Sequence, residues 1–364
     1  MSMIPWAKPL FFEKEKKYLA QALDSTWISH GPFVEQFENE FLTWHGASYG
    51  ITTSNGTTAL QLALLGAGVG PGDEVIVPGF TFVAAGNMAI AVGAKPLFVE
   101  VDPETWCIDP TRIERAITPR TKAIIPVHLY GNVCDMDAIM EIAAKHKLFV
   151  IEDNAEAAFS KYKGRYAGTI GDIGCFSFQA TKTITMGEGG FVISRDKAVH
   201  ERMRVIRDHG MRKGKRYWHD VVGFNFRVTN MQAAVGCGQL ARAKTIIEKK
   251  KQMYEWYRER LTNQSGIILQ AIRDDVDPVI WAVALRVNEA VFQRTRDEII
   301  EALLAADIET RPGFYPFSVL PLYQAQPMPI CEEIGAHVLS LPSFPQLTEK
   351  EIGHICDVLI GLRK

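Results

Sequence analysis

The sequence predicts an α/β protein with a mainly parallel, mixed sheet flanked by helices, followed by a smaller α+β C-terminal domain. Continuous apolar runs alternate with amphipathic segments, a pattern typical of strands buried on both faces of a parallel sheet. The 364 residues are long for one compact unit, and the pattern changes past about residue 265, where prolines cluster. We therefore expect a large domain over residues 1–250 and a small one over residues 251–364.

The expected elements follow in chain order. Amphipathic helices come first, over 11–23 and 33–44. The expected strands are 49–53, 75–78, 97–102, 123–127 and 148–153, and the helices between them are 57–67, 83–92 and 135–146. Helices at 197–207 and from about 230 to 262 complete this part, the second being long enough to link two domains. The small domain has a strand at 278–286, a helix at 294–306, and a last helix that begins at Thr348 with a capping box to Glu351.

Composition excludes several classes of function. The formal net charge of −2 argues against binding nucleic acid or a membrane surface through bulk electrostatics. No segment approaches the roughly 18 apolar residues of a membrane span, and the N-terminus has no apolar core long enough for a signal peptide. Six scattered cysteines without a CxxC pair indicate free thiols in a reducing cytoplasm, and neither disulfides nor a metal site.

Lys182 stands out within the segment CFSFQATKTITMGEGGFVI, residues 175–193. Lysine is normally a solvated surface charge, but here it lies among small, hydroxyl and glycine residues between two apolar runs. We hypothesise that Lys182 carries covalent chemistry as a Schiff base.

Two further features belong with this lysine. Ser54–Thr58 lies between a strand and a helix N-terminus, where free N–H groups favour a phosphate, although the same residue types also serve as ordinary helix caps. Asp153 ends an apolar strand, where α/β proteins place ligand groups, and it too could be a helix cap. A phosphate site, a strand-end carboxylate and a framed lysine together suggest pyridoxal 5'-phosphate (PLP) as the cofactor.

The chain resembles the DegT/DnrJ/EryC1/StrS family of sugar aminotransferases. Matching blocks run nearly end to end and include SNGTTAL (54–60), IEDNAEA (151–157), GDIGCFSFQATKTITMGEGG (171–190), KRYWHDVVGFNFRVTNMQAA (215–234) and TRPGFYP (310–316). The resemblance implies fold type I of the PLP-dependent aminotransferases and a cytoplasmic homodimer whose subunits share their active sites.

The resemblance also implies roles for individual residues. Lys182 is expected to bind the cofactor covalently and to relay protons, and Asp153 to hold the proton of the pyridine nitrogen. The other expected cofactor contacts are Gly56, Thr57 and Ser177 at the phosphate, Glu156 near the ring, Phe82 stacked on the ring or buried in the core, and Asn225 reaching the neighbouring subunit's phosphate. Candidates for nucleotide-sugar contacts, or for simple loop packing, are Trp27, Tyr217, Trp218, His219, Arg311 and Tyr315.

The implied reaction moves the amino group of L-glutamate to the 4-keto group of a nucleotide-linked 4-keto-6-deoxyhexose. The expected acceptor is GDP-4-keto-6-deoxy-D-mannose, which gives GDP-perosamine for O-antigen or related polysaccharide biosynthesis. Three alternatives stay open: a UDP- or dTDP-linked acceptor, amination at C3, and a regulator that binds PLP without catalysis.

Overall fold

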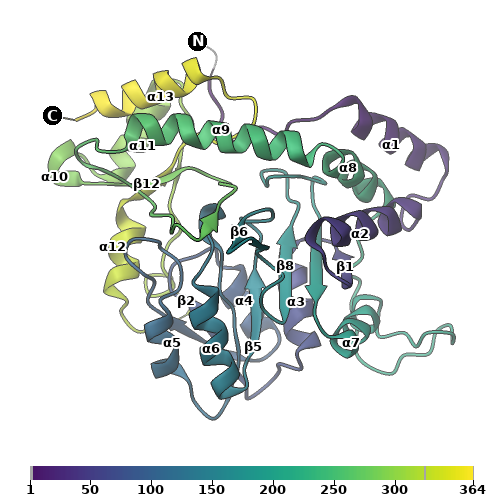
Figure 1. The fold of residues 1–364 in the computed structure, drawn as a ribbon. Helices are drawn as coiled ribbons and strands as arrows, with labels where there is room; N and C mark the ends of the chain where they lie inside the picture. The colour runs from purple at the N-terminus through teal and green to yellow at the C-terminus, as the bar shows by residue number, and fades with distance from the viewer. Residues whose placement is uncertain (1–2, 324, 364) are drawn as a thin grey trace.

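A seven-stranded mixed sheet forms the centre of the computed structural model, which describes residues 3–323 and 325–363 (Figure 1). Its order is β1-β9-β8-β5-β4-β2-β3. Strands β8, β5, β4, β2 and β3 run parallel to one another, whereas β9 lies between β8 and β1 and runs antiparallel to both. The strands are β1 (Tyr49–Thr53), β2 (Glu74–Pro78), β3 (Lys95–Val99), β4 (Thr121–Ile124), β5 (Phe149–Asp153), β8 (Ile173–Ser177) and β9 (Gly190–Ser194). The predicted α/β class with a mainly parallel sheet is confirmed.

Helices pack on both faces of this sheet because successive side chains of a buried strand point to opposite sides. In β2, Val75 and Val77 join a core with helices α3 and α4, whereas Ile76 joins a separate core with α5 and α6. The helices of this part are α1 (Glu13–Asp24), α2 (Pro32–His45), α3 (Gly56–Gly66), α4 (Ala84–Ala91), α5 (Pro110–Ala116), α6 (Met136–His146), α7 (Lys197–Arg207) and α8 (Asn230–Leu240).

The C-terminal part has its own core, which draws on α9, the following strands and helices, and Ile4 from the N-terminal segment. Its antiparallel sheet has the order β10-β12-β14-β13. The elements are α9 (Ala243–Leu261), β10 (Ile267–Leu269), β12 (Ala284–Val287), α10 (Glu289–Phe292), α11 (Arg296–Ala305), β13 (Arg311–Pro312), α12 (Pro329–His337), β14 (Val338–Ser340) and α13 (Glu349–Gly361). The predicted capping box of Thr348 and Glu351 is present at the start of α13. The domain boundary at residue 250 stays a prediction.

Small elements complete the described chain. Strands β11 (Val276–Asp277), β6 (Lys161–Tyr162) and β7 (Arg165–Tyr166) form a third sheet, and η1 (Leu129–Gly131) is a short 3-10 turn. Within residues 3–323 and 325–363, no helix is both long and apolar enough to cross a membrane.

Several predicted elements are wrong in extent; for example, the strand expected over 123–127 is β4, which ends at Ile124. The single helix expected over 230–262 is two helices, because α8 packs against α1 and α2 whereas α9 packs against α13. The strand expected over 97–102 is β3, which ends at Val99, and Asp102 lies in a turn where its side chain accepts hydrogen bonds from the N–H groups of Glu104 and Thr105.

The strand expected over 278–286 is also shorter, and this difference matters for the site. Only β12 is a strand, because the preceding N–H groups donate elsewhere: Val279 to the Ser160 hydroxyl, Trp281 to the Tyr130 carbonyl, and Val283 to the Ser343 hydroxyl. The irregular backbone before β12 therefore crosses over to the loops of the large sheet and brings Trp281 with it.

Candidate functional site

A cavity of about 720 Å³ lies at the end of the large sheet where its parallel strands terminate. Asp153 ends β5 and Ser177 ends β8, while Gly190 at the start of β9 is paired with both Ser177 and Thr53. This register places the start of α3, which follows β1, beside the ends of β5 and β8. Seven of the predicted residues line the cavity: Gly56, Thr57, Phe82, Asp153, Glu156, Ser177 and Lys182.

The N-terminus of α3 is built to face a ligand. The side chain of Asn55 caps the helix by accepting the N–H of Thr58 at 2.9 Å. Helix geometry gives the N–H groups of Gly56 and Thr57 no acceptor inside the helix, so they are available to an anion in the cavity. Asn55 therefore fills the capping role that was the alternative interpretation of this tract, and it leaves Gly56 and Thr57 for binding.

Gly56 lets the helix start approach Ser177. A Cβ atom at position 56 would lie 2.7 Å from the Cβ of Ser177, closer than carbon atoms pack without displacement. We expect Gly56→Ala to weaken binding of a phosphate-bearing ligand by about tenfold to a hundredfold, since overpacking costs roughly 1–3 kcal/mol. Titration of purified protein with PLP, followed by absorbance, measures the effect.

Gly70→Ala is the matched control for this substitution. Position 70 has nothing within 4 Å of an added Cβ, so the control should bind the ligand like the parent protein. Equal affinity of Gly56→Ala and Gly70→Ala would contradict a phosphate site at the start of α3.

The Lys182 side chain is 14% exposed, and the surroundings of its amine have opposing effects on its pKa. Its Nζ is 3.7 Å from Glu156 Oε1 and 3.7 Å from the centre of a Trp281 ring. Burial lowers the pKa of Lys182, while the carboxyl groups of Glu156 and Asp153 act in the opposite direction. The net lowering favours the neutral amine, which is the form that can act as a nucleophile or base.

Two buried carboxyl groups face this amine. Burial raises the pKa of Glu156 to about 7, although Lys182 and the N–H of Tyr130, which donates to Glu156 at 2.7 Å, both lower it. Burial also raises the pKa of Asp153, and the N–H of Ala155 and the charge of Lys182 partly offset this effect. A cationic group bound in the cavity would bring both side chains toward the ionised form.

A buried hydrogen-bonded pair, His128 and Glu152, lies next to Asp153 and was not predicted from the sequence. Nδ1 of His128 accepts the N–H of Cys134 at 3.2 Å, so the proton resides on Nε2, which donates to Glu152 at 2.9 Å. Glu152 also accepts the N–H groups of Gly168, Ile170 and Gly171. These bonds tie the end of β5 to the loop that enters β8. Glu152 immediately precedes Asp153 in a buried strand, which was the available signal.

An aromatic wall closes one side of the cavity. Tyr130 lies nearly parallel to both Trp281 and Phe314, with ring centres 6.3 and 5.5 Å away. A second cavity of about 500 Å³ shares this wall and is also lined by Arg311 and Tyr315, two of the predicted nucleotide-sugar contacts. Phe82 lines both cavities and is 54% exposed, so it is not a core side chain.

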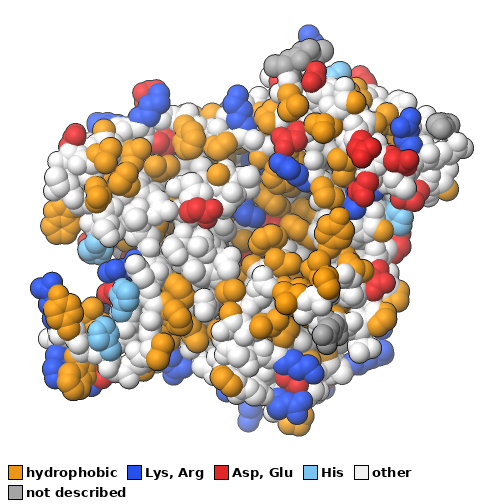
Figure 2. Space-filling view, turned by 180° about the vertical axis from the view of Figure 1, so that it is seen from behind, with side chains coloured by type: hydrophobic (Ala, Val, Ile, Leu, Met, Phe, Trp, Pro, Cys, Tyr) orange, Lys and Arg blue, Asp and Glu red, His pale blue; other side chains and the backbone are white. Residues whose placement is uncertain are grey.

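Five predicted site residues lie outside both cavities: Trp27, Tyr217, Trp218, His219 and Asn225. Four belong to the arm 208–225, which projects from the molecule beyond α7 (Figure 1). Figure 2 shows the arm at lower left, with basic, hydrophobic and histidine side chains gathered on it. Asn225 accepts a hydrogen bond from Arg227 at 3.0 Å. One copy of the chain therefore does not bring these residues to the site.

Comparisons with known proteins agree with this geometry. The model of the DegT/DnrJ/EryC1/StrS aminotransferase family matches residues 11–360. The chain is 44% identical to GDP-perosamine synthase of Escherichia coli O157:H7, covering 98% of both chains, and 41% identical to GDP-perosamine synthase of Caulobacter vibrioides, covering 97% of this chain and 96% of the other. Among solved structures, the PLP-form of the putative sugar aminotransferase Spr1654 from Streptococcus pneumoniae is similar with a TM-score of 0.94 and 27% identity, covering 99% and 98% of the two chains.

Proposed function

Because the chain belongs to the DegT/DnrJ/EryC1/StrS aminotransferase family, we propose that it transfers the amino group of L-glutamate to the 4-keto group of GDP-4-keto-6-deoxy-D-mannose. The similarity to two GDP-perosamine synthases over almost the whole chain carries this proposal. The enzyme is PLP-dependent, as are its structural relatives. We also propose that it acts in the cytoplasm, since its six cysteines are free and buried.

The residues of the large cavity fit PLP. The N–H groups at the start of α3 and the hydroxyl of Ser177 suit its phosphate, and the carboxyl of Asp153 suits its ring nitrogen. Lys182 supplies the amine for the covalent bond, and Phe82 offers a ring face. When bound, the cofactor supplies an electron-withdrawing ring that stabilises negative charge at the carbon that carries the nitrogen.

The chain's own part in the reaction is to move protons and to exclude water. Lys182 takes a proton from one substrate carbon and returns it at another, which a buried amine with a lowered pKa can do near neutral pH. Glu156, with a pKa of about 7 and an oxygen 3.7 Å from Nζ, holds the amine in place between these steps. Trp281 shields the amine from solvent on one side, and the Tyr130 ring lies nearly parallel to those of Trp281 and Phe314.

The proposal is tested by incubating the purified enzyme with L-glutamate and a panel of nucleotide keto-sugars. We expect 2-oxoglutarate to be released and NMR of the product to place the new amine at C4 of the GDP-linked sugar. A new amine at C3, or a preference for a UDP- or dTDP-linked sugar, would assign one of the alternative acceptors. No 2-oxoglutarate from a single turnover with glutamate would instead support a regulator that only binds PLP.

A homodimer with shared active sites is part of the proposal. The projecting arm carries large apolar side chains that are exposed in one copy of the chain, including Tyr217 at 73% and Val222 at 83% exposure. Exposed apolar groups of this size are typical of surfaces that another protein covers. In a dimer the arm would bring Asn225, and with it Tyr217, Trp218 and His219, to the neighbouring cavity.

Mixing two inactive variants tests the shared site. We expect Asn225→Ala and Lys182→Ala to be inactive or nearly so alone, and their heterodimers to regain about a quarter to a half of the parent rate, because one of the two sites then has both intact residues. Activity of tagged heterodimers, purified by two affinity steps, measures the recovery. Verified heterodimers without any recovery would show that Asn225 acts within its own subunit.

A further inference from the structure

Lys250 on α9 is a second buried lysine with an unusual environment. Only 2% of it is exposed, and its amine donates to two backbone carbonyls, that of Trp281 at 2.6 Å and that of Ser343 at 2.8 Å. Burial lowers the pKa of Lys250 to about 7, and the charge of Lys182 adds to the effect. A neutral amine has two N–H bonds, which these two carbonyls satisfy, so Lys250 suits this place without a counter-ion.

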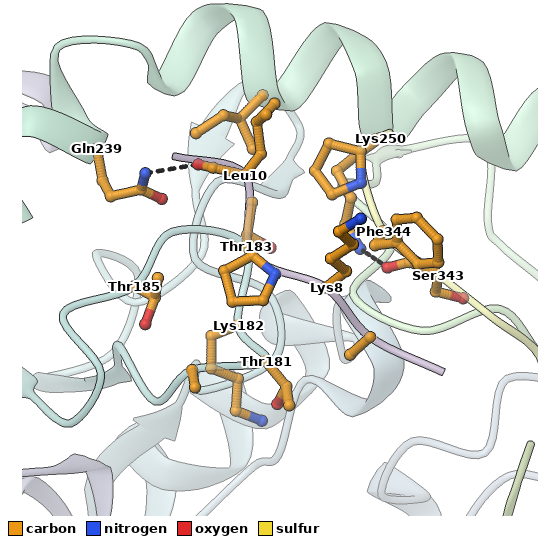
Figure 3. A pocket seen from close by; sticks show the side chains of 15 residues that line it. Lys8, Leu10, Thr181, Lys182, Thr183, Thr185, Gln239, Lys250, Ser343 and Phe344 are labelled. Atoms are coloured by element: carbon orange, nitrogen blue, oxygen red, sulfur yellow. Dashed lines mark hydrogen bonds between the residues drawn. The ribbon is translucent and has the colours of Figure 1, made fainter. Parts of the chain in front are cut away.

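The space beside Lys250 is too small for a ligand. It is a cavity of about 20 Å³, enough for roughly one water molecule, and its other titratable lining residues are Lys8 and Lys182. Figure 3 shows Lys250 reaching from the helix toward Ser343, with Lys182 across the pocket below it. Lys250 therefore acts through its two hydrogen bonds, which join α9 to the backbone of Trp281 and Ser343.

Those bonds end at the wall of the active site. Trp281 belongs to the irregular segment before β12, which no strand partner holds, and its N–H donates to Tyr130 at 2.9 Å. Its indole N–H donates to the carbonyl of Thr181 at 2.8 Å, immediately before Lys182, and its ring lies against the Lys182 amine. Lys250 thus fixes the backbone of the residue that covers the reactive lysine.

We propose that Lys250 is a positioning residue for the reaction, which holds the Trp281 carbonyl so that the indole stays packed on the Lys182 amine. The inference rests on the proposed function only where catalysis is measured. Without Lys250, the segment around Trp281 loses its bond to α9, and water reaches the Lys182 amine. The pKa of Lys182, which burial lowers, then rises toward its ordinary value.

Lys250→Met keeps an unbranched side chain only one atom shorter but removes both hydrogen bonds. In protein freed of cofactor, we expect the pH midpoint for acylation of Lys182 by acetic anhydride, followed by mass spectrometry of its peptide, to move upward. In the loaded enzyme we expect kcat to fall about tenfold to a hundredfold, as for a misplaced catalytic group. Lys250→Gln, whose amide offers two N–H donors, should recover part of both losses.

Tyr257→Phe is the matched control. Tyr257 is two turns further along α9, and its hydroxyl donates to the Pro342 carbonyl at 2.9 Å, beside the Ser343 contact but without a bond to Trp281. It should lower the unfolding temperature and leave the acylation midpoint of Lys182 unchanged. If Lys250→Met behaves in the same way, with unchanged kcat and midpoint, the proposal is wrong.

A double-mutant cycle completes the test. If Lys250 acts through Trp281, then Lys250→Met adds nothing to the loss caused by Trp281→Ala, whereas independent effects would multiply and overturn the proposal. Should Lys250→Met not fold, the same cycle with Lys250→Gln decides between these outcomes. The acylation midpoints need no sugar substrate, so they test Lys250 even if the proposed acceptor proves wrong.

Discussion

Replacing Lys182 with alanine is expected to lower kcat by at least about a thousandfold, since the proposed function has this side chain both bind the cofactor and move the proton. The amine is buried beside two carboxyl groups and an indole, and the described structure places no second lysine amine among the residues that line the large cavity. Initial rates of 2-oxoglutarate formation from glutamate measure the loss.

Borohydride reduction provides a second readout for the same lysine. In the parent enzyme, we expect reduction to leave the cofactor attached to a peptide that contains Lys182, and in Lys182→Ala we expect no attachment. Lys251→Ala is the control, because Lys251 on α9 is paired with Asp277 at the surface and should not matter. Ordinary turnover by Lys182→Ala would show that the chemistry is assigned to the wrong residue.

The convergence of Lys182, Asp153 and Gly56–Thr57 on one cavity could be predicted from the sequence because each lies at the end of a strand or in the segment that follows one. Lys182, Asp153 and the Gly56–Thr57 tract each follow or precede a short apolar run, and parallel strands necessarily end at one edge of the sheet. Once the strands were recognised, the convergence of these residues followed from the α/β topology.

The positions of Trp281, which lines the cavity, and of Lys250, which donates to its carbonyl, could not be predicted in the same way. Trp281 lies in an apolar run that has the periodicity of a strand, yet its neighbours' N–H groups donate to Ser160 and Ser343, more than 50 residues away in the chain. Local pattern does not record such tertiary bonds. The same holds for Lys250, which occupies an ordinary position in a charged helix and is buried only because the 281–283 and 341–343 segments cross over it.

The arm 208–225 marks a second kind of limit. Its residues were predicted to bind the nucleotide sugar or the neighbouring phosphate, and within one copy of the chain they reach neither cavity. The structure of a single chain cannot contain a site that two subunits form together. The predicted contacts of the arm are therefore tested by the heterodimer experiment.

Asp153→Asn is expected to lower kcat by about a hundredfold to a thousandfold. In the proposed function the Asp153 carboxylate is the counter-charge of the protonated ring nitrogen of PLP, and leaving such a buried cation unpaired costs roughly 3–5 kcal/mol. The buried Asp153 carboxyl is at the carboxyl end of β5 and accepts the N–H of Ala155 at 3.1 Å. Asparagine has nearly the same shape and retains an oxygen for that bond, so the substitution changes charge more than structure. Steady-state kinetics with glutamate measure the loss.

The substitution also has a consequence that needs no cofactor. The Asp153 charge raises the pKa of Lys182, so its removal should lower that pKa further and move the pH midpoint of Lys182 acylation downward, opposite to the shift expected for Lys250→Met. Asp172→Asn is the matched control, since Asp172 accepts the N–H of Val150 at 2.8 Å near the other end of β5 and lies away from the cavity. The contrary result is that Asp153→Asn has the same kcat and the same pH midpoint of Lys182 acylation as Asp172→Asn. That result would show that Asp153 has only a structural role at the end of β5, and that another group in the cavity must pair with the pyridine nitrogen.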